Sequence, residues 1–195
     1  MTIASRPRGS SATTRPNWPV FAGLAAGILV ADQITKAIVT GALRPGEVRP
    51  VLGDAIRIVH GQNSGALFGM FKDNAAMFGL ASLVVIALIV VYHARSTRSL
   101  YLSVTLGLLL GGALGNVTDR LRLGYVVDFV DAGLGSWRWY TFNVADAAIS
   151  GAIVLLVLAA IRPSLAGGTL GGGDRRDVPA ARPNLDGSDA PRVDG

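Results

Sequence analysis

The stretch GNVTDRLRLGYVVDF, residues 115–129, carries two aspartates and two arginines, and it begins at the end of the apolar run LGLLLGGALG, residues 106–115. A helix needs about 20 apolar residues to cross the hydrocarbon core of a bilayer. Charged groups beside such a segment are costly in lipid, and they usually face a bundle interior, a partner or a cavity. The stretch therefore predicts a membrane-spanning helix with a functional site at its end.

The composition predicts a membrane protein. The chain has 195 residues, of which 50% are hydrophobic and 16% are charged. Its apolar residues gather in four uncharged stretches, which are residues 17–31, 74–92, 99–118 and 147–161. Only helices and closed barrels satisfy their backbone groups in lipid, and the alternating segments of a barrel do not occur in this sequence. We expect an all-α membrane protein, a bundle of four transmembrane helices spanning about residues 17–43, 75–92, 99–118 and 143–162.

The two ends of the chain are polar and lie outside this bundle. Residues 1–16 contain three arginines and precede an apolar run that has no small-x-small cleavage site before a polar mature start, so we expect an uncleaved first span rather than a secretory signal. Residues 163–195 are rich in Gly, Pro, Asp and Arg and have no aromatic residue. This composition predicts a disordered tail. Residues 17–162 would then form a single membrane domain.

The orientation follows from the distribution of basic residues. The link between the second and third spans, residues 93–98, is short and holds Arg95 and Arg98. Short basic links usually lie in the cytoplasm, so with four spans the N-terminal arm and the tail are both expected there. Several arginines also fall in the outer loops, and these count against this orientation. The aromatic loop SWRWYTF, residues 136–142, is typical of the interface on the outer side of a membrane, and we expect a multi-pass membrane protein.

Two local patterns add detail to the bundle. Four glycines in the third span favour close packing against neighbouring helices: Gly107, Gly111, Gly112 and Gly115. In the first long loop, AIRIVHG alternates apolar and polar residues and predicts a strand.

The depths of the carboxylates were estimated from the helical rise. With about 1.5 Å per residue and about 30 Å of hydrocarbon, Asp32 and Asp146 lie roughly 22 Å above the cytoplasmic face. Asp119 reaches the outer boundary, and Asp128 follows nine residues later, close enough to fold back over the helix ends. We therefore expect four acids from three helices in one layer near the outer face.

Some of these acids have basic neighbours that offer a purely structural explanation. Asp32 lies one helical turn before Lys36, so that the two side chains share a face. Asp119 is followed closely by Arg120 and Arg122. Ion pairing within each helix would account for these charges without any chemistry.

Asp128 and Asp146 lack a basic residue within four positions. Two such carboxylates in a site of low dielectric constant do not both ionise, so the pair holds one shared proton. This arrangement suits peptide hydrolysis. The ionised member takes a proton from the attacking water, while the protonated member donates to the carbonyl oxygen and later to the leaving amine.

Four blocks of this sequence resemble, in order and spacing, the motif blocks of the lipoprotein signal peptidase family, also called signal peptidase II. They are DQITK (32–36), NSGALF (63–68), GGALGNVTDRLRLGYVVDF (111–129) and FNVADAAI (142–149). The resemblance covers about residues 18–162, and the long third block followed by FNVAD is its most specific part. Leu67 departs from the pattern, since a small residue is common at that position.

The resemblance implies an aspartic endopeptidase of the bacterial plasma membrane, with its active site at the outer face, that removes the signal peptide from diacylglyceryl-modified prolipoproteins by cutting before the lipidated cysteine. It implies Asp128 and Asp146 as the catalytic dyad. Substrate-binding or supporting roles are implied for Asp32, Lys36, Asn63, Gly65, Asn116, Asp119, Arg120 and Asn143. It further implies a small extracytoplasmic β-cradle near residues 51–60, with periplasmic-side loops and a short amphipathic segment before residue 75.

Two other classes of function fit a membrane protein with intramembrane carboxylates. A proton-coupled transporter or channel uses them as relays, but it favours acids spread across depth. A structural membrane subunit would have no chemistry of its own. Substitution of Asp128 or Asp146 by Asn separates these classes from a protease.

The remaining expectations concern partners and cofactors. The net charge of +5 is spread over tails and loops without an aromatic-interleaved patch, so nucleic-acid binding is not expected. The chain has no cysteine, and His60 and His93 lie far apart, so we expect no metal and no other cofactor. The expected partners are diacylglyceryl prolipoproteins and membrane lipid. The sequence does not set the oligomeric state, for which a monomer is the expectation.

Overall fold

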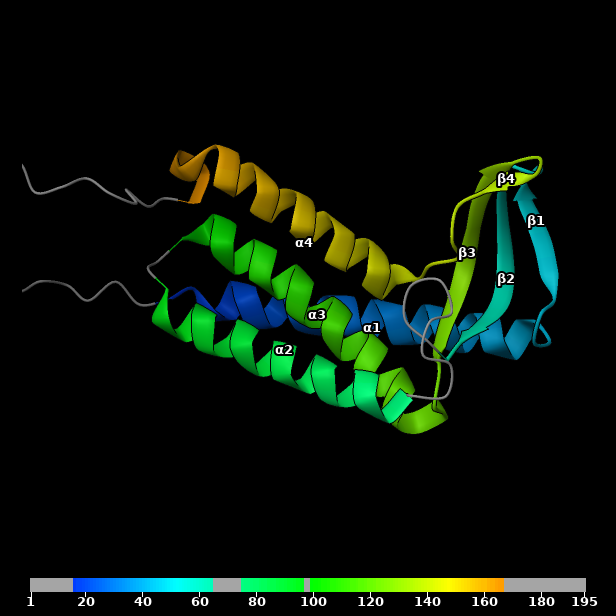
Figure 1. Ribbon diagram of the computed structural model, residues 1–195, viewed down its shortest axis with the longest axis horizontal. Helices are drawn as coiled ribbons and strands as arrows, with labels where there is room; N and C mark the ends of the chain where they lie inside the picture. Colours follow the sequence, from blue (N-terminus) through cyan, green and yellow to red (C-terminus); the bar gives the residue numbers. More distant parts are fainter. Residues whose placement is uncertain (1–15, 65–74, 97–98, 167–195) are drawn as a thin grey trace, which may run out of the picture.

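The computed structural model describes residues 16–64, 75–96 and 99–166. Its helices lie side by side, and a small sheet covers one end of them (Figure 1). The helices are α1 (Trp18–Ala42), α2 (Ala75–Arg95), α3 (Leu100–Leu123) and α4 (Val144–Ile161), followed by the short 3-10 helix η2 (Pro163–Ala166). The antiparallel sheet has the order β1-β2-β3-β4, with β1 Val48–Leu52, β2 Ile56–Asn63, β3 Val126–Leu134 and β4 Trp137–Arg138.

Local signals in the sequence explain where the helices begin and end. The side chain of Ser99 caps α3 by accepting a hydrogen bond of 3.2 Å from the backbone N–H of Leu102. Gly124 ends the same helix in the left-handed conformation, with φ of 80°, which glycine adopts without strain. The end of α3 is therefore set by a glycine that lies beyond the charged residues 119–122.

Helix α3 packs closely on α1 and α4 because its glycines leave room for their backbones. A Cβ atom on Gly107 would lie 2.9 Å from the carbonyl oxygen of Phe21, and one on Gly111 would lie 2.8 Å from that of Ala25. On the other side, a Cβ on Gly112 would lie 2.5 Å from the carbonyl oxygen of Ala145. The predicted role of these glycines in close helix packing is confirmed.

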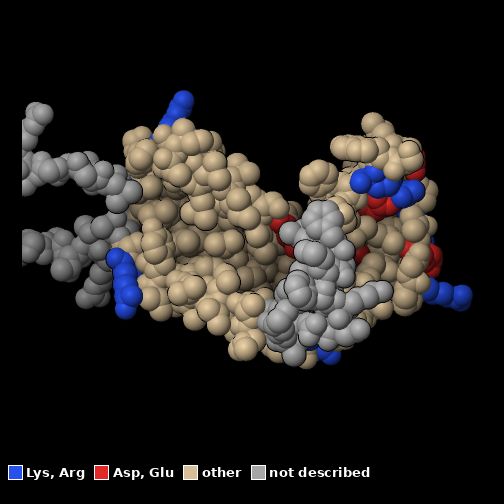
Figure 2. Space-filling model, viewed as in Figure 1, with Lys and Arg blue, Asp and Glu red and all other residues tan. Residues whose placement is uncertain are grey.

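The outer faces of the bundle are apolar. Large exposed side chains cover α1, α2 and α4, among them Ile38, Leu80, Leu88 and Val154. On the face shown in Figure 2, charged side chains appear at the left end of the molecule and from its middle to its right end, and the helical surface between them is uncharged. Within the described residues, α1, α3 and α4 are long and apolar enough to cross a membrane, and α2 contributes a shorter apolar segment, Gly79–Arg95. The protein is thus a membrane protein, whose described residues form four α-helices, a short 3-10 helix and a small sheet.

The sheet is attached to the end of α1. Phe129 of β3 is buried against Val39 and Leu43, at the point where the helix gives way to the loop before β1. Helix α1 extends toward the sheet end of the molecule, where β1, β2 and β3 lie across it (Figure 1). This contact fixes the height of β3 above the bundle.

The structure corrects three of the predictions. A small sheet accompanies the helices, as the predicted β-cradle requires, but it extends beyond the predicted stretch near 51–60, because residues 126–134 also form a strand. Asp128 therefore comes from a strand, and the expectation of four acids from three helices was wrong. Helix α3 continues five residues past 118 to Leu123, since a helix does not end where its apolar residues end.

Several predictions concern residues that the structure does not describe. Of the N-terminal arm only Pro16 is described, and of the tail only residues 163–166, which form η2. Gly65 and the predicted amphipathic segment before residue 75 also lie outside the described residues.

Candidate active site

Asp146 is held in the first turn of α4 by the residue that caps this helix. The side-chain oxygen of Asn143 accepts a hydrogen bond of 2.9 Å from the backbone N–H of Asp146. In return, Oδ2 of Asp146 accepts a hydrogen bond of 3.3 Å from the backbone N–H of Asn143. This reciprocal capping box fixes one oxygen of the Asp146 carboxylate.

Asp128 is buried on β3 and accepts hydrogen bonds from two asparagine side chains. Nδ2 of Asn63 lies 3.0 Å from its Oδ2, and Nδ2 of Asn143 lies 2.8 Å from its Oδ1. Asn63 pairs with Val126 in the register of β2 and β3, so it lies diagonally across from Asp128 on the same face of the sheet. The strand register thus brings Asn63 to the carboxylate.

Gly61 lies directly opposite Asp128 in this register. A Cβ atom at Gly61 would lie 2.8 Å from the backbone oxygen of Asp128, closer than a side chain tolerates. The close approach of the two strands behind the carboxylate therefore requires a glycine at this position.

Asn116 of α3 connects the second carboxylate to the centre of the bundle. Its Nδ2 donates a hydrogen bond of 2.8 Å to Oδ1 of Asp146. Its Oδ1 lies 3.3 Å from both Nζ of Lys36 and Nδ2 of Asn143. An asparagine donates hydrogen bonds without a full positive charge, so Asn116 orients the Asp146 carboxylate without forming a salt bridge with it.

Burial raises the pKa of the Asp128 carboxyl from its ordinary value of 3.8 to about 6, and the negative charge of Asp146 adds to this rise. The hydrogen bonds from Asn63 and Asn143 oppose it. The two acids, predicted to meet, both bind Asn143, which contacts Asp128 through its side chain and Asp146 through its backbone N–H. A pair of this kind holds a proton close to neutral pH.

Beside this pair lies a buried cluster of charges centred on Lys36. Its Nζ is 2.8 Å from Oδ2 of Asp32 and 2.8 Å from Oδ2 of Asp119. The predicted pairing of Asp32 with Lys36 is confirmed. The ion pair of Asp119 is with Lys36 on another helix, whereas the sequence suggested Arg120 or Arg122. Arg120 is the next residue in the helix and does not face Asp119, and Arg122 binds the side chain of Gln33.

Arg120 lies on the last turns of α3 and directs positive charge toward the acids. Its Nη1 is 3.5 Å from the backbone oxygen of Asn116. The guanidinium is attracted electrostatically by Asp146, Asp128 and Asp119. Of the residues predicted for the site, those described in the structure therefore gather at one place between the sheet and the helix ends: Asp32, Lys36, Asn63, Asn116, Asp119, Arg120, Asp128, Asn143 and Asp146.

Two residues of this site were not assigned a role from the sequence. Gln33 donates a hydrogen bond of 2.9 Å to Oδ1 of Asp119, and it accepts one of 3.2 Å from Arg122. The sequence could have indicated a role for Gln33, because this residue follows Asp32 in the block DQITK. Gly61 gave no signal, because its role depends on the strand register.

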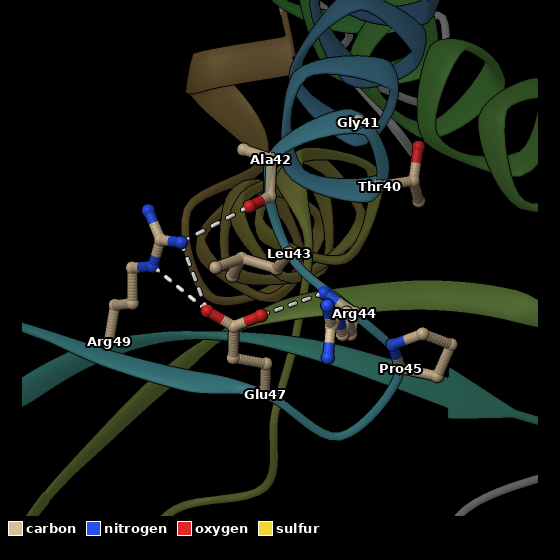
Figure 3. Close-up of a pocket in the computed structure, with 8 residues that line it drawn as sticks. All are labelled: Thr40, Gly41, Ala42, Leu43, Arg44, Pro45, Glu47 and Arg49. Atoms are coloured by element: carbon tan, nitrogen blue, oxygen red, sulfur yellow. Dashed lines mark hydrogen bonds and ion pairs between the residues drawn. The ribbon is translucent and has the colours of Figure 1, made fainter.

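A surface pocket of about 780 Å³ lies elsewhere, where α1 leads into β1 (Figure 3). Its polar groups bind one another: Arg49 donates to the carbonyl oxygen of Ala42 and to Glu47, and Glu47 accepts from the backbone of Arg44. These contacts satisfy backbone groups at and just after the end of α1, so the polar residues of the pocket have a structural role. In the described residues, no group of three or more His, Cys, Asp or Glu side chains is arranged to bind a metal ion.

Comparison with known proteins identifies several similar chains. The family model described as signal peptidase (SPase) II matches residues 24–162. The lipoprotein signal peptidase of Syntrophomonas wolfei is 39% identical over 132 residues, which cover 67% of this chain and 86% of the relative. That of Caulobacter vibrioides is 41% identical over 157 residues, covering 76% and 90%. A bacterial membrane enzyme solved by the in meso method at 2.3 Å resolution matches with a TM-score of 0.73 at 25% identity, covering 78% of this chain and 93% of that one.

Proposed function

The chain belongs to the signal peptidase II family, and from this premise we propose that Asp128 and Asp146 form the catalytic dyad of a membrane aspartic peptidase. The protein is a peptidase that removes signal peptides from prolipoproteins. The observation that carries the proposed dyad is the bridge made by Asn143, which donates a hydrogen bond to each carboxylate. One asparagine thus holds both acids at a common place.

The proposed reaction is hydrolysis by a water molecule between the two carboxylates. The ionised aspartate accepts a proton from the water as its oxygen attacks the scissile carbonyl carbon, and the protonated aspartate donates its proton to the carbonyl oxygen. When the C–N bond breaks, the leaving nitrogen receives the proton taken from the water, and the carbonyl oxygen returns its proton to the dyad. The products are an amine and a carboxylic acid, and the dyad again holds one proton.

The asparagines orient this pair in the proposed mechanism. Hydrogen bonds from Asn63 and Asn143 fix the carboxylate oxygens of Asp128. Hydrogen bonds from Asn116 and Asn143 fix those of Asp146. Preorganised donors of this kind lower the barrier because little rearrangement is needed during the reaction. We extend the proposal to Gly65, which follows Asn63 closely in the chain and whose family position suggests contact with substrate.

The proposed arrangement in the membrane has four spans, with both termini in the cytoplasm and the dyad at the outer face. Three helices have the length and composition of spans, and the apolar α2 packs beside α3. The 18 residues of α4 extend about 27 Å at 1.5 Å per residue, so Asp146 in its first turn comes close to one boundary of the hydrocarbon core. The exposed Trp137 and Trp139 at the sheet end favour an interfacial position there.

This arrangement fits a lipidated substrate, for which we propose a diacylglyceryl-modified prolipoprotein cut before its lipidated cysteine. The acyl chains of such a substrate keep its cleavage site at the membrane surface, which is the depth proposed for the dyad. Water is also available at that depth. A dyad at mid-membrane would require a buried channel.

A proton relay is less well supported by the same observations. A relay needs titratable groups at successive depths along a path. In the described residues, the carboxylates that contact the dyad network all lie at the sheet end of the bundle, and the part of α4 beyond Asp146 carries no ionisable side chain.

The dyad is tested by Asp128→Asn and Asp146→Asn, each purified in lipid and assayed with a diacylated prolipoprotein and with its unlipidated precursor. Arg49→Gln, an exposed substitution on the sheet, is the matched control. We expect both Asn variants to be folded and inactive, the control to be active, and the unlipidated precursor to be a poor substrate. Normal cleavage by either Asn variant would overturn the assignment.

A further inference from the structure

We propose that Asp32, Lys36 and Asp119, here called the Lys36 brace, set the distance between the two aspartates of the dyad and thereby act as positioning residues. The inference rests on the proposed function of Asp128 and Asp146. It comes from a relationship that the sequence does not show: each acid of the brace binds the backbone immediately before one member of the dyad.

The first contact is between α1 and α4. Oδ1 of Asp32 accepts a hydrogen bond of 3.0 Å from the backbone N–H of Ala145. The first turn of a helix has N–H groups without helical partners, and a carboxylate is a favourable acceptor for them. Since Ala145 directly precedes Asp146, this bond fixes the backbone that carries the second catalytic acid.

The second contact is between α3 and β3. Oδ2 of Asp119 accepts a hydrogen bond of 3.1 Å from the backbone N–H of Val127, the residue directly before Asp128. The carbonyl oxygen of the same Val127 accepts a hydrogen bond of 3.2 Å from Nδ2 of Asn143. Two side chains therefore bind both backbone groups of Val127, and they hold the backbone that carries the first catalytic acid.

Lys36 joins these two contacts. Its ammonium group lies 2.8 Å from a carboxylate oxygen of each acid, and the exposed fractions of the three side chains are at most 4%. A buried ion pair of this kind has a defined geometry, because separating the charges leaves them unpaired away from water. The dense fit is shown by Gly115, where a Cβ atom would lie 2.6 Å from Oδ2 of Asp32.

The brace has a consequence for catalysis. Asp128 belongs to a strand and Asp146 to a helix, so their separation depends on whatever connects these two elements. Asn143 connects them directly, and the Lys36 brace connects them through α1. Loss of the brace should leave the substrate contacts in place but displace one acid relative to the other, which lowers kcat more than it changes KM.

The test is a double-mutant cycle of Asp32→Ala and Asp119→Ala, with kcat, KM and the pH profile of kcat measured for each variant in lipid. Asp131→Asn is the matched control, because Asp131 is a buried, ion-paired carboxylate on the same strand whose partners are Arg57 and Arg138. We expect each brace variant to lower kcat about 100-fold with KM within about twofold, as for a displacement of about 1 Å in an active site. The control should keep its kcat.

The double variant decides whether the two acids act as one unit. If Lys36 joins them, breaking either end releases the dyad, and the double variant loses about the same 100-fold rather than about 10,000-fold. The acidic limb of its pH profile should also move to lower pH, since the two dyad acids lie further apart and since Lys36, whose charge lowers the pKa of Asp128, loses both of its carboxylate partners. Additive effects on log kcat, or an equal loss in Asp131→Asn, would each overturn the brace.

A second set of variants covers the case in which the alanine variants do not fold. Asp32→Asn and Asp119→Asn keep an oxygen acceptor for the backbone N–H groups but lose the charge that binds Lys36. We expect the same non-additive pattern with a loss of at least about tenfold each, and unchanged kcat would overturn the brace. Asp146→Asn, assayed in parallel, separates the two proposals: its normal activity would remove the dyad, whereas additive brace effects with an inactive Asp146→Asn would remove the brace alone.

Discussion

The side-chain nitrogen Nδ2 of Asn143 lies 2.8 Å from Oδ1 of Asp128, so the residue that caps α4 also binds the carboxylate of β3. The same asparagine forms the capping box with Asp146. Its position in the fold therefore serves both stability and the proposed chemistry, and the two contributions can be separated by substitution.

Replacing Asn143 by Ser should uncouple these contributions. A serine still caps the helix, so the free energy of unfolding should change by less than about 1 kcal/mol, whereas Asn143→Ala should lower it by about 1–2 kcal/mol. Both variants lose the donor to Asp128 and should lose most of their kcat. Thermal unfolding and single-turnover cleavage measure the two effects, and a fully active Asn143→Ser would show that the donor is dispensable.

The sequence could predict the helices because the hydrocarbon core limits what they contain. The predicted spans match the ends of α1 to α4 to within three residues, with the exception of the end of α3. That end is set by Gly124, whereas the apolar pattern stops at 118. The sequence also contained the capping box, since Asn143 and Asp146 have the required spacing.

The strand β3 and the pairing of Asp119 could not be predicted in this way. Residues 126–134 become a strand because they pair with β2, more than 60 residues earlier in the chain, and the register that places Gly61 opposite Asp128 is a property of that pairing. The bond between Asp119 and Lys36 likewise depends on how α1 lies against α3. Contacts between distant elements decided these features, and local patterns do not contain them.

Gly61→Ala should impair catalysis through the backbone of Asp128. The added methyl group would lie 2.8 Å from the backbone oxygen of Asp128, so the strands must separate. We expect a loss of about 1–3 kcal/mol in stability, as for overpacking elsewhere, together with a marked fall in kcat. Gly151→Ala in α4 is the control, since nothing lies within 4 Å of its Cβ position, and it should be neutral. Equal behaviour of the two variants would contradict this account.

The ion cluster of the sheet should contribute to stability alone. Asp131 accepts hydrogen bonds from Arg57 and Arg138, and burial opposes these contacts in setting its pKa, which is held below the usual range. A carboxylate with a lowered pKa stabilises the fold above its unfolded pKa, and this contribution is lost as the pH falls through the folded value. Asp131→Asn should therefore lower the melting temperature at pH 7 but less at acidic pH, with kcat retained. A loss of activity at full stability would contradict this assignment.

Asp128 should show the opposite dependence on pH. Because burial and Asp146 raise its pKa from 3.8 to about 6, the folded state favours the protonated carboxyl. This contribution is complete below pH of about 4 and is lost as the pH rises through about 6, so ionisation of Asp128 costs about 3 kcal/mol at neutral pH. Relative to the wild type, Asp128→Asn should thus gain stability between pH 4 and pH 8 while remaining inactive, since its side chain does not ionise. Melting temperatures of both proteins across this range measure the effect, and a difference that does not vary with pH would show that Asp128 titrates as an ordinary surface acid.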